Sequence, residues 1–360
     1  MHGQTVLFAG GSRPPCDSAL ELALQIAERA PNLRLVWLGP RSKSSLIGLP
    51  PLHFARPRSL AHVTELARTR LVITTHGADG ARRLPFMRPP IVQTWHGIPI
   101  KRMGRRNLRA DTPEQGILPV AHSTPWNFIL SPSEFYDTEL VDALSWIGTR
   151  IRVPLPRYSL PQRVQREDTR LRLRRRLGLD PSTKIVLFAP TYRATHDLGS
   201  FEPMNSRQLL TRLLREEYFV LARGHHHEMN RPNNRAAALT KDLNAEDSLL
   251  VLSACDVLVT DYSSLVVDAA FLDIPTVLLT PDIDNYELSP GLTIPLRQLA
   301  AGILTACVAS AAEQVVEQTA KGFPVELRKL MLAIGGLPTD PLSPLPSPFD
   351  QNDDLRAILG

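Results

Sequence analysis

The sequence lacks the signatures of several common protein classes. Its three cysteines, Cys16, Cys255 and Cys307, are far apart and odd in number, which excludes a disulfide framework and a CxxC metal knuckle and is typical of a reducing compartment. No basic segment followed by an apolar run stands near the N-terminus, so no secretory signal is expected. The longest uncharged stretch of the second half, residues 298–312, is shorter than the ~20 apolar residues of a membrane span. We therefore expect a soluble protein that is at most peripheral to a membrane.

The common nucleotide and metal motifs are also missing. There is no GxxxxGK(S/T) phosphate loop, no GxGxxG after the first predicted strand, and no HExxH metal signature. His225, His226 and His227 are consecutive, but adjacent side chains rarely all point at one ion, and no carboxylate or cysteine stands at ligand spacing. The sequence therefore predicts no metal site.

Positive charge is concentrated in two short parts of the chain. The formal net charge is +5, yet residues 150–176 alone contain ten arginines, and the remainder of the chain is slightly acidic. A second basic run, residues 101–109, contains no acidic residue. Such runs favour a phosphate-containing partner: a nucleotide, an anionic membrane face, a phosphate-rich polymer or nucleic acid.

Strand-like and helical patterns alternate along the chain and predict an α/β fold. In the first half, strands are expected at residues 5–9, 33–38, 71–75 and 91–94, and a helix at 18–29. In the second half, strands are expected at residues 184–189, 219–222, 256–260 and 276–280, and helices at 207–217 and 265–272. This alternation predicts two doubly wound halves with parallel sheets, whose ligands bind at the carboxyl ends of the strands.

We accordingly predict four parts of the chain: a Rossmann-like domain over residues 1–155, an Arg-rich linker over 156–180, a second Rossmann-like domain over 181–325, and a C-terminal helix with a Pro-rich tail over 326–360. Pro154, Pro156 and Pro161 predict an extended start of the linker. The proline-dense residues 337–348 predict an extended strap or disordered end outside the core.

The strongest chemical signal directly follows the strand predicted at residues 91–94. Residues 94–101 read TWHGIPIK and place His96 in a Gly/Pro loop at the end of a strand. A neutral imidazole with a pKa near ~6.5 can accept a proton at neutral pH. An isolated histidine there would more often be structural, but the Trp-His-Gly-x-Pro-x-Lys setting favours a general base.

Three further strand ends, all in the second half, carry polar groups: Thr191, Tyr192 and Arg193; Arg223, Gly224 and His225; and Ser263 and Ser264. The two serines stand at the start of a predicted helix, where hydroxyls and unpaired backbone N–H groups suit a phosphate. Asp268 lies one turn further along the same face of that helix. Each group alone could be a cap or a surface ion pair, but together they predict an anion-binding site opposite His96.

These blocks resemble the CDP-glycerol glycerophosphotransferases, bacterial enzymes of teichoic acid and capsule synthesis. The resembling stretches include VQTWHGIPIKRMG at 92–104, VLFAPTYR at 186–193 and DVLVTDYSSLVVDAAFLDIP at 256–275. The resemblance implies a GT-B fold, in which the parallel sheets of two Rossmann-like domains face each other across a cleft. It also implies transfer of a polyol phosphate, glycerol phosphate in the first place, from a CDP-activated donor to a cell-wall or capsule polymer or a lipid-linked acceptor, with release of CMP.

The resemblance assigns roles to residues of this sequence. His96 would be the general base for the acceptor hydroxyl in the N-terminal domain, and His225 with Arg223 would neutralise the donor pyrophosphate in the C-terminal domain. The CDP-polyol is a substrate, so no cofactor is implied. Whether His225 or His226 faces the phosphate, and whether the enzyme is a primase or a polymerase, stays open. The donor-binding residues would be Gly97, Ile98, Pro99, Ile100, Arg157, Thr191, Tyr192, Arg193, Arg223, Gly224, Ser263, Ser264 and Asp268.

Two other functions are open at this point. A GT-B glycosyltransferase that uses a nucleotide sugar would share the fold and differ in its donor. A non-catalytic nucleic-acid-binding or membrane-binding module would use the Arg-rich residues, but these are not interleaved with aromatics and the His96 loop would have no purpose. We expect a cytoplasmic enzyme without a nucleic-acid partner, held at most peripherally on the anionic cytoplasmic face of the plasma membrane.

Overall fold

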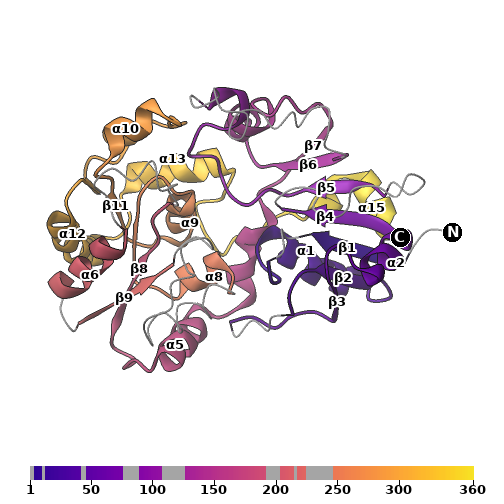
Figure 1. The fold of residues 1–360 in the computed structure, drawn as a ribbon, viewed down its shortest axis with the longest axis horizontal. Coiled ribbons are helices and arrows are strands. Elements are labelled where there is room, and N and C mark those ends of the chain that lie inside the picture. Colours follow the sequence, from indigo (N-terminus) through magenta and orange to yellow (C-terminus); the bar gives the residue numbers. More distant parts are fainter. Residues whose placement is uncertain are drawn as a thin grey trace.

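The strands that the structure describes form two separate parallel sheets, one in each lobe (Figure 1). The computed structural model describes residues 4–9, 13–41, 46–75, 89–107, 126–191, 203–214, 217–223 and 246–360. The first sheet has the order β3-β2-β1-β4-β5-β6-β7. Its strands are β1 (Thr5–Ala9), β2 (Arg34–Leu38), β3 (Leu52–Ala55), β4 (Thr69–Thr74), β5 (Ile91–Gln93), β6 (Phe128–Ser131) and β7 (Thr149–Arg152).

The second sheet has the order β12-β11-β10-β8-β9. Its strands are β8 (Lys184–Phe188), β9 (Tyr218–Ala222), β10 (Val257–Thr260), β11 (Thr276–Leu279) and β12 (Leu304–Thr305). In each sheet the strand order reverses once, between β1 and β4 and between β8 and β10. The loops after these strands separate towards opposite faces of the sheet, which opens a crevice where ligands of such folds bind.

Helices cover the faces of both sheets, as alternating strands and helices require. The first lobe has α1 (Asp17–Arg29), α2 (Leu60–Ala67) and α4 (Glu134–Tyr136). The second has α6 (Pro203–Leu214), α8 (Ser248–Ser253), α9 (Leu265–Leu272), α10 (Ile283–Leu288), α11 (Leu296–Leu299), α12 (Val308–Lys321) and α13 (Val325–Gly335). Across the described residues, the helices fall short of the length and apolar character that a membrane span needs.

The strands predicted from the sequence are confirmed, with ends within two residues of the observed ones. They are buried along almost their whole length, because parallel strands are covered on both faces. The predicted helices at residues 18–29, 207–217 and 265–272 are α1, α6 and α9. Four strands were not predicted: the edge strands β3, β7 and β12, each of which exposes part of its side chains, and the short buried strand β6.

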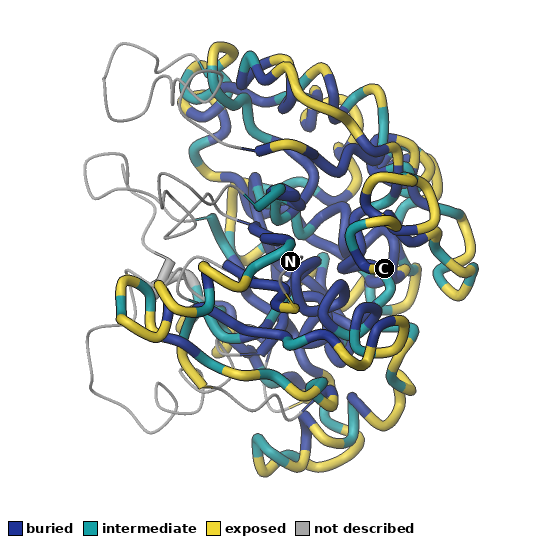
Figure 2. Tube along the Cα trace, turned by 90° about the vertical axis from the view of Figure 1, so that its right-hand side faces the viewer, coloured by how far each residue is buried: buried dark blue, intermediate teal, exposed yellow. Residues whose placement is uncertain are grey.

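One hydrophobic core extends through both lobes. It includes Leu7 and Val72 of the first sheet, Leu187 and Leu258 of the second, and Tyr158 between them. Figure 2 shows the buried residues running through the middle of the molecule, with exposed residues at the rim. A smaller core lies between the other face of the second sheet and helices α6 and α12. The two lobes are therefore packed against each other through a shared core and are not independent domains joined by a flexible linker.

The segment predicted as an Arg-rich linker is mostly helical, and the prediction of an extended start is wrong from Pro156 onwards, because Pro156 begins a 3₁₀ helix that also contains Pro161. It forms the 3₁₀ helix η3 (Pro156–Arg163) and α5 (Arg166–Leu177), which ends at Gly178 in the left-handed conformation and packs on α8. Seven of the ten arginines of residues 150–176 form ion pairs with carboxylates: Arg150, Arg152, Arg157, Arg163, Arg170, Arg174 and Arg176. Most of this charge therefore serves packing between elements and is not a free basic surface.

The C-terminal residues return to the first lobe. The proline-rich residues 337–347 contain no helix or strand, as predicted for a strap. The chain then forms α14 (Pro348–Gln351) and α15 (Asp353–Leu359), and α15 lies beside the first sheet in Figure 1. Phe349 and Leu355 are buried, and Arg29 donates two hydrogen bonds to Asp350. The end of the chain thus completes the core of the first lobe, which the sequence analysis did not predict.

Candidate active site

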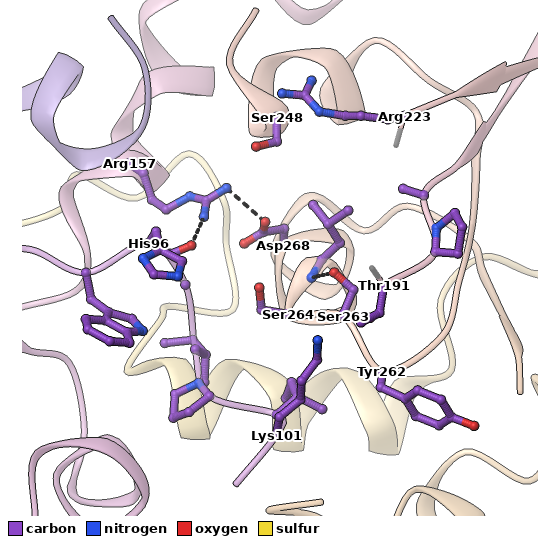
Figure 3. Close-up of a pocket in the computed structure, with 18 of the residues that line it drawn as sticks. His96, Lys101, Arg157, Thr191, Arg223, Ser248, Tyr262, Ser263, Ser264 and Asp268 are labelled. Atoms are coloured by element: carbon purple, nitrogen blue, oxygen red, sulfur yellow. Dashed lines mark hydrogen bonds and ion pairs between the residues drawn. The ribbon is translucent and has the colours of Figure 1, made fainter. Parts of the chain in front are cut away.

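A cavity of about 530 Å³ lies between the two lobes, at the carboxyl ends of their strands. His96 and Arg157 lie on one side of it, Ser263 and Ser264 at its floor, and Arg223 and Ser248 at the opposite end (Figure 3). Eleven of the residues predicted for the site line this cavity: His96, Gly97, Ile98, Pro99, Ile100, Arg157, Thr191, Arg223, Ser263, Ser264 and Asp268. Tyr192, Arg193, Gly224, His225 and His226 lie outside the described residues.

The loop that carries His96 leaves β5 through a tight turn. Gln93 accepts a hydrogen bond from the backbone N–H of Trp95 at 2.8 Å, and Trp95 takes a positive φ of 56°. The imidazole stacks on the Trp95 indole, with 4.8 Å between ring centroids. Gly97 has φ of 149°, and a Cβ there would lie 2.7 Å from Ser264 Oγ. The motif therefore needs glycine because the start of α9 approaches the backbone next to His96.

His96 is held as a neutral base. Its Nδ1 lies 3.1 Å from the carbonyl oxygen of Thr75, which can only accept, so the proton resides on Nδ1 and the lone pair on Nε2. Burial is the main cause that lowers the pKa of His96, and the positive charges of Arg13 and Arg157 lower it further. The imidazole is thus unprotonated at neutral pH, as a general base must be.

The same loop is tied to the second lobe by main-chain hydrogen bonds. Arg102 N donates to Gly291 O, and Thr293 N donates to Ile100 O, each at 3.0 Å. Thr293 Oγ1 donates to Pro99 O at 2.7 Å. These bonds pair residues 100–102 of the first lobe with residues 291–293 of the second, so the base has a fixed position relative to the opposite wall of the cavity.

That opposite wall is formed at the junction of β10 and α9. Asp261 Oδ1 accepts the backbone N–H groups of Thr191 at 2.8 Å and of Tyr262 at 2.6 Å, which fixes the loops after β8 and β10 together. Ser263 Oγ accepts the N–H of Leu265 at 3.3 Å. The first turn of α9 therefore presents hydroxyls and the positive end of the helix dipole to the cavity.

Arg157 and Asp268 form a buried ion pair beside His96 (Figure 3). Arg157 Nη2 donates to Asp268 Oδ2 at 3.0 Å and Nη1 donates to the carbonyl oxygen of His96 at 2.9 Å. Tyr158 OH donates to the second oxygen, Oδ1, of Asp268 at 2.9 Å. Burial raises the pKa of Asp268 to about 6, against the opposing effect of Arg157. Both residues thus brace the His96 loop from within the protein, besides lining the cavity.

Arg223 presents a buried donor at the far end of the cavity. Its Nη2 donates to Glu246 O at 2.8 Å, whereas Nη1 is buried and has no hydrogen-bond partner among the described residues. Burial lowers the pKa of Arg223, although the guanidinium remains protonated at neutral pH. A buried donor without a partner costs free energy unless a ligand satisfies it, so this end of the cavity suits an anion.

The sequence analysis missed three polar residues that line the cavity: Arg13, Lys101 and Ser248. Lys101 belongs to the TWHGIPIK motif, and its ammonium group lies 5.9 Å from the centroid of the Tyr286 ring. Ser248 follows Asp247, which caps α8, so a helix-start signal was present. Arg13 follows β1 without any motif around it. Within the described ranges, no cluster of three or more His, Cys, Asp or Glu side chains could hold a metal ion.

Known proteins with similar sequences indicate which family this chain belongs to. A family model described as CDP-glycerol:poly(glycerophosphate) glycerophosphotransferase matches residues 2–322. The chain is 28% identical over 275 residues to a teichoic acid poly(glycerol phosphate) polymerase of Bacillus spizizenii, covering 71% of this chain and 68% of that protein. It is 27% identical over 309 residues to the polymerase of the same name from Staphylococcus epidermidis, covering 79% of this chain and 41% of that protein. The chain thus spans only part of the length of these relatives.

The fold is also known from a solved structure. A variant of the wall teichoic acid polymerase TagF superposes with a TM-score of 0.74 at 17% identity, over 99% of this chain and 89% of that chain. This similarity confirms the predicted GT-B fold, with two parallel sheets on either side of a cleft.

Proposed function

The chain belongs to the CDP-glycerol:poly(glycerophosphate) glycerophosphotransferase family, and we propose that it transfers glycerol phosphate from CDP-glycerol to a hydroxyl group of a wall-polymer acceptor, releasing CMP. The observation that carries this proposal is the placement of a neutral imidazole against an anion-binding helix start. His96 precedes Gly97, and Gly97 abuts Ser264 at the start of α9. The proposed base is therefore next in sequence to a residue that contacts the proposed phosphate site.

The reaction can be followed through the residues of the cavity. The acceptor hydroxyl loses its proton to Nε2 of His96 as its oxygen attacks the β-phosphorus of the donor. The bond between that phosphorus and the bridging oxygen breaks, and CMP leaves with the oxygen and its electron pair. The product is a phosphodiester that extends the acceptor by one glycerol phosphate.

The negative charge of the transition state needs fixed partners. Ser263, Ser264 and the start of α9 offer hydroxyl and dipole contacts to the diphosphate, and Arg223 offers the buried Nη1. Such donors do not have to reorient during the reaction, so they favour the transition state over the ground state. His225, Gly224, Tyr192 and Arg193 stay proposed members of the site on the basis of the resemblance.

The proposal is tested by CMP release from CDP-glycerol in the presence of a glycerol phosphate oligomer. His96→Ala removes the base and should lower kcat by ~10²–10⁴-fold, the contribution of a positioned general base. His53→Ala is the matched control, because His53 is exposed on edge strand β3. Equal turnover in wild type and His96→Ala would refute the role of His96.

A thermal-shift screen separates this function from that of a nucleotide-sugar transferase. CDP-glycerol and CDP-ribitol should stabilise the protein, and UDP- or CMP-sugars should not, because only a ligand that binds the folded state raises the Tm. Stabilisation by a nucleotide sugar alone would favour the glycosyltransferase.

We further propose that the acceptor is reached at the cytoplasmic face of the membrane. Cys16, Cys255 and Cys307 are free thiols, which agrees with a reducing compartment. The arginines of residues 150–176 give little support to an electrostatic membrane contact, because most of them pair with carboxylates of the protein.

A further inference from the structure

Arg13 is a cation of the cavity that neither the motifs nor the reaction described above uses. It lines the cavity from the loop between β1 and α1, in the same lobe as His96. Its backbone is anchored, because its carbonyl oxygen accepts a hydrogen bond from Nε1 of the fully buried Trp37 at 2.8 Å. The side chain therefore projects towards the cavity from a fixed point.

The positive charge of Arg13 is not neutralised by a carboxylate among the described residues. Unlike most arginines of residues 150–176, Arg13 has no ion pair with any carboxylate that the structure describes. The charge of Arg13 acts on both ends of the cavity. Burial is the main cause that lowers the pKa of His96 and the pKa of Arg223, and the positive charge of Arg13 lowers both pKa values further. Arg13 thus lies close to the base and to the anion-binding end.

The cavity has more cationic side chains than the two negative charges of the donor diphosphate require. Among the described lining residues, Arg13, Lys101, Arg157 and Arg223 are cationic and Asp268 is the one carboxylate, paired with Arg157. The diphosphate of CDP-glycerol carries two negative charges. Arg223 of the second lobe can balance one of them, and Lys101 of the His96 loop, whose ammonium group lies 5.9 Å from the centroid of the Tyr286 ring in the second lobe, can balance the other. The charge of Arg13, on the lobe of the base, is left for a third anionic group.

An acceptor that ends in glycerol phosphate brings such a group. Its attacking hydroxyl and its phosphodiester are at opposite ends of one glycerol unit. When the hydroxyl reaches His96, the phosphodiester is held within one glycerol length of the base, on the side from which the acceptor enters. A planar guanidinium can donate two parallel hydrogen bonds to a phosphate, so arginine suits this position better than lysine.

We propose that Arg13 binds the phosphodiester of the acceptor's terminal unit and so selects a glycerol phosphate chain end over an uncharged acceptor. This inference rests on the proposed function and deepens it, because it names the group of the acceptor that the enzyme recognises.

The test compares two acceptors that differ in one charge. One is a short glycerol phosphate oligomer, and the other carries a neutral methyl phosphonate in place of its terminal phosphodiester. The KM of each acceptor and of CDP-glycerol is measured for wild type, Arg13→Ala and Arg13→Lys, and binding of the oligomer without donor is measured by calorimetry. Arg212→Ala, an exposed arginine on α6, controls for the loss of one positive charge.

Arg13→Ala should raise the KM of the charged acceptor about ten- to a hundredfold, as expected for the loss of charge-assisted hydrogen bonds. The KM of the neutral acceptor and of CDP-glycerol should stay within about twofold of wild type, Arg13→Lys should recover part of the loss, and Arg212→Ala should have no effect. An equal effect on both acceptors, or a rise in the KM of CDP-glycerol instead, would overturn the proposal.

The two proposals fail in different ways. If wild type releases CMP and Arg13→Ala treats both acceptors as wild type does, the acceptor role of Arg13 is wrong and the proposed function stands. If the oligomer binds to wild type, not to Arg13→Ala, and no CMP is released from CDP-glycerol, the anion site stands and the proposed donor is wrong.

Discussion

Replacing Gly97 by alanine tests whether the position of His96 depends on contact with α9. A Cβ on Gly97 would lie 2.7 Å from Ser264 Oγ and 3.2 Å from Ser264 Cβ, whereas ordinary contacts begin near 3.4 Å. Either the His96 loop or Ser264 must therefore shift by about 0.7 Å, and a misplacement near 1 Å in the site can cost ~10²-fold in rate. We expect kcat/KM for CMP release to fall about ten- to a hundredfold.

A second glycine with a positive φ serves as a control in which an added Cβ meets no other residue. Gly178 also has a positive φ, 67°, but a Cβ there would meet nothing within 4 Å. Gly178→Ala should lower the free energy of unfolding by about 1 kcal/mol and leave kcat/KM unchanged. The double variant Gly97→Ala/Ser264→Ala removes the 2.7 Å contact and should have a higher Tm than Gly97→Ala alone, while its activity stays below that of wild type because the Ser264 hydroxyl is a proposed diphosphate contact. Full activity of Gly97→Ala, with an unchanged Tm, would refute the reasoning.

Two further predictions concern buried charges. Burial raises the pKa of Asp268 from 3.8 to about 6, so its contribution to stability is full below pH ~4 and is lost as pH rises to about 6. The side chain of Asp268→Asn cannot titrate. The unfolding free energy of wild type minus that of the variant should therefore fall between pH 4 and pH 6 and stay constant above pH 6. A difference that does not change with pH would contradict this prediction. Arg174→Leu removes a buried guanidinium that donates to Thr183 O, Ala254 O and Asp256, so unfolding by urea should show a loss of about 3 kcal/mol, with kcat nearly unchanged; a loss of activity without a loss of stability would contradict it.

The regular part of the fold could be predicted because burial leaves a strong trace in the sequence. Strands such as β1 and β8 are covered on both faces and read as continuous apolar runs. Edge strand β7, TRIR, exposes three of its four residues, so its sequence has no such run. Helices α14 and α15 follow a proline-rich segment, and only contact with the first lobe shows why Phe349 and Leu355 are apolar.

The site was predictable where polar residues directly follow strands. His96, Thr191, Arg223 and Ser263 were found in this way, because carboxyl ends of parallel strands meet at one edge. The pairing of Arg157 with Asp268 joins positions 111 residues apart, and no local pattern indicates it. This pairing changes the interpretation of both residues, which hold the protein's own loop in place as well as facing the cavity.

Hydrogen bonds between the lobes explain how two separate sheets can hold the proposed reaction site in one arrangement. In a two-lobed fold the base and the phosphate site belong to different sheets, so a hinge between them would add a closing step before each turnover. Here residues 100–102 are hydrogen-bonded to residues 291–293, and Arg157 joins the carbonyl oxygen of His96 to Asp268 on α9. Main-chain bonds on one side of the His96 loop and a buried ion pair on the other fix it to the second lobe. The orientation of His96, the proposed base, is therefore set during folding, and we expect substrate binding only to place the proposed acceptor and donor between walls that are already in position.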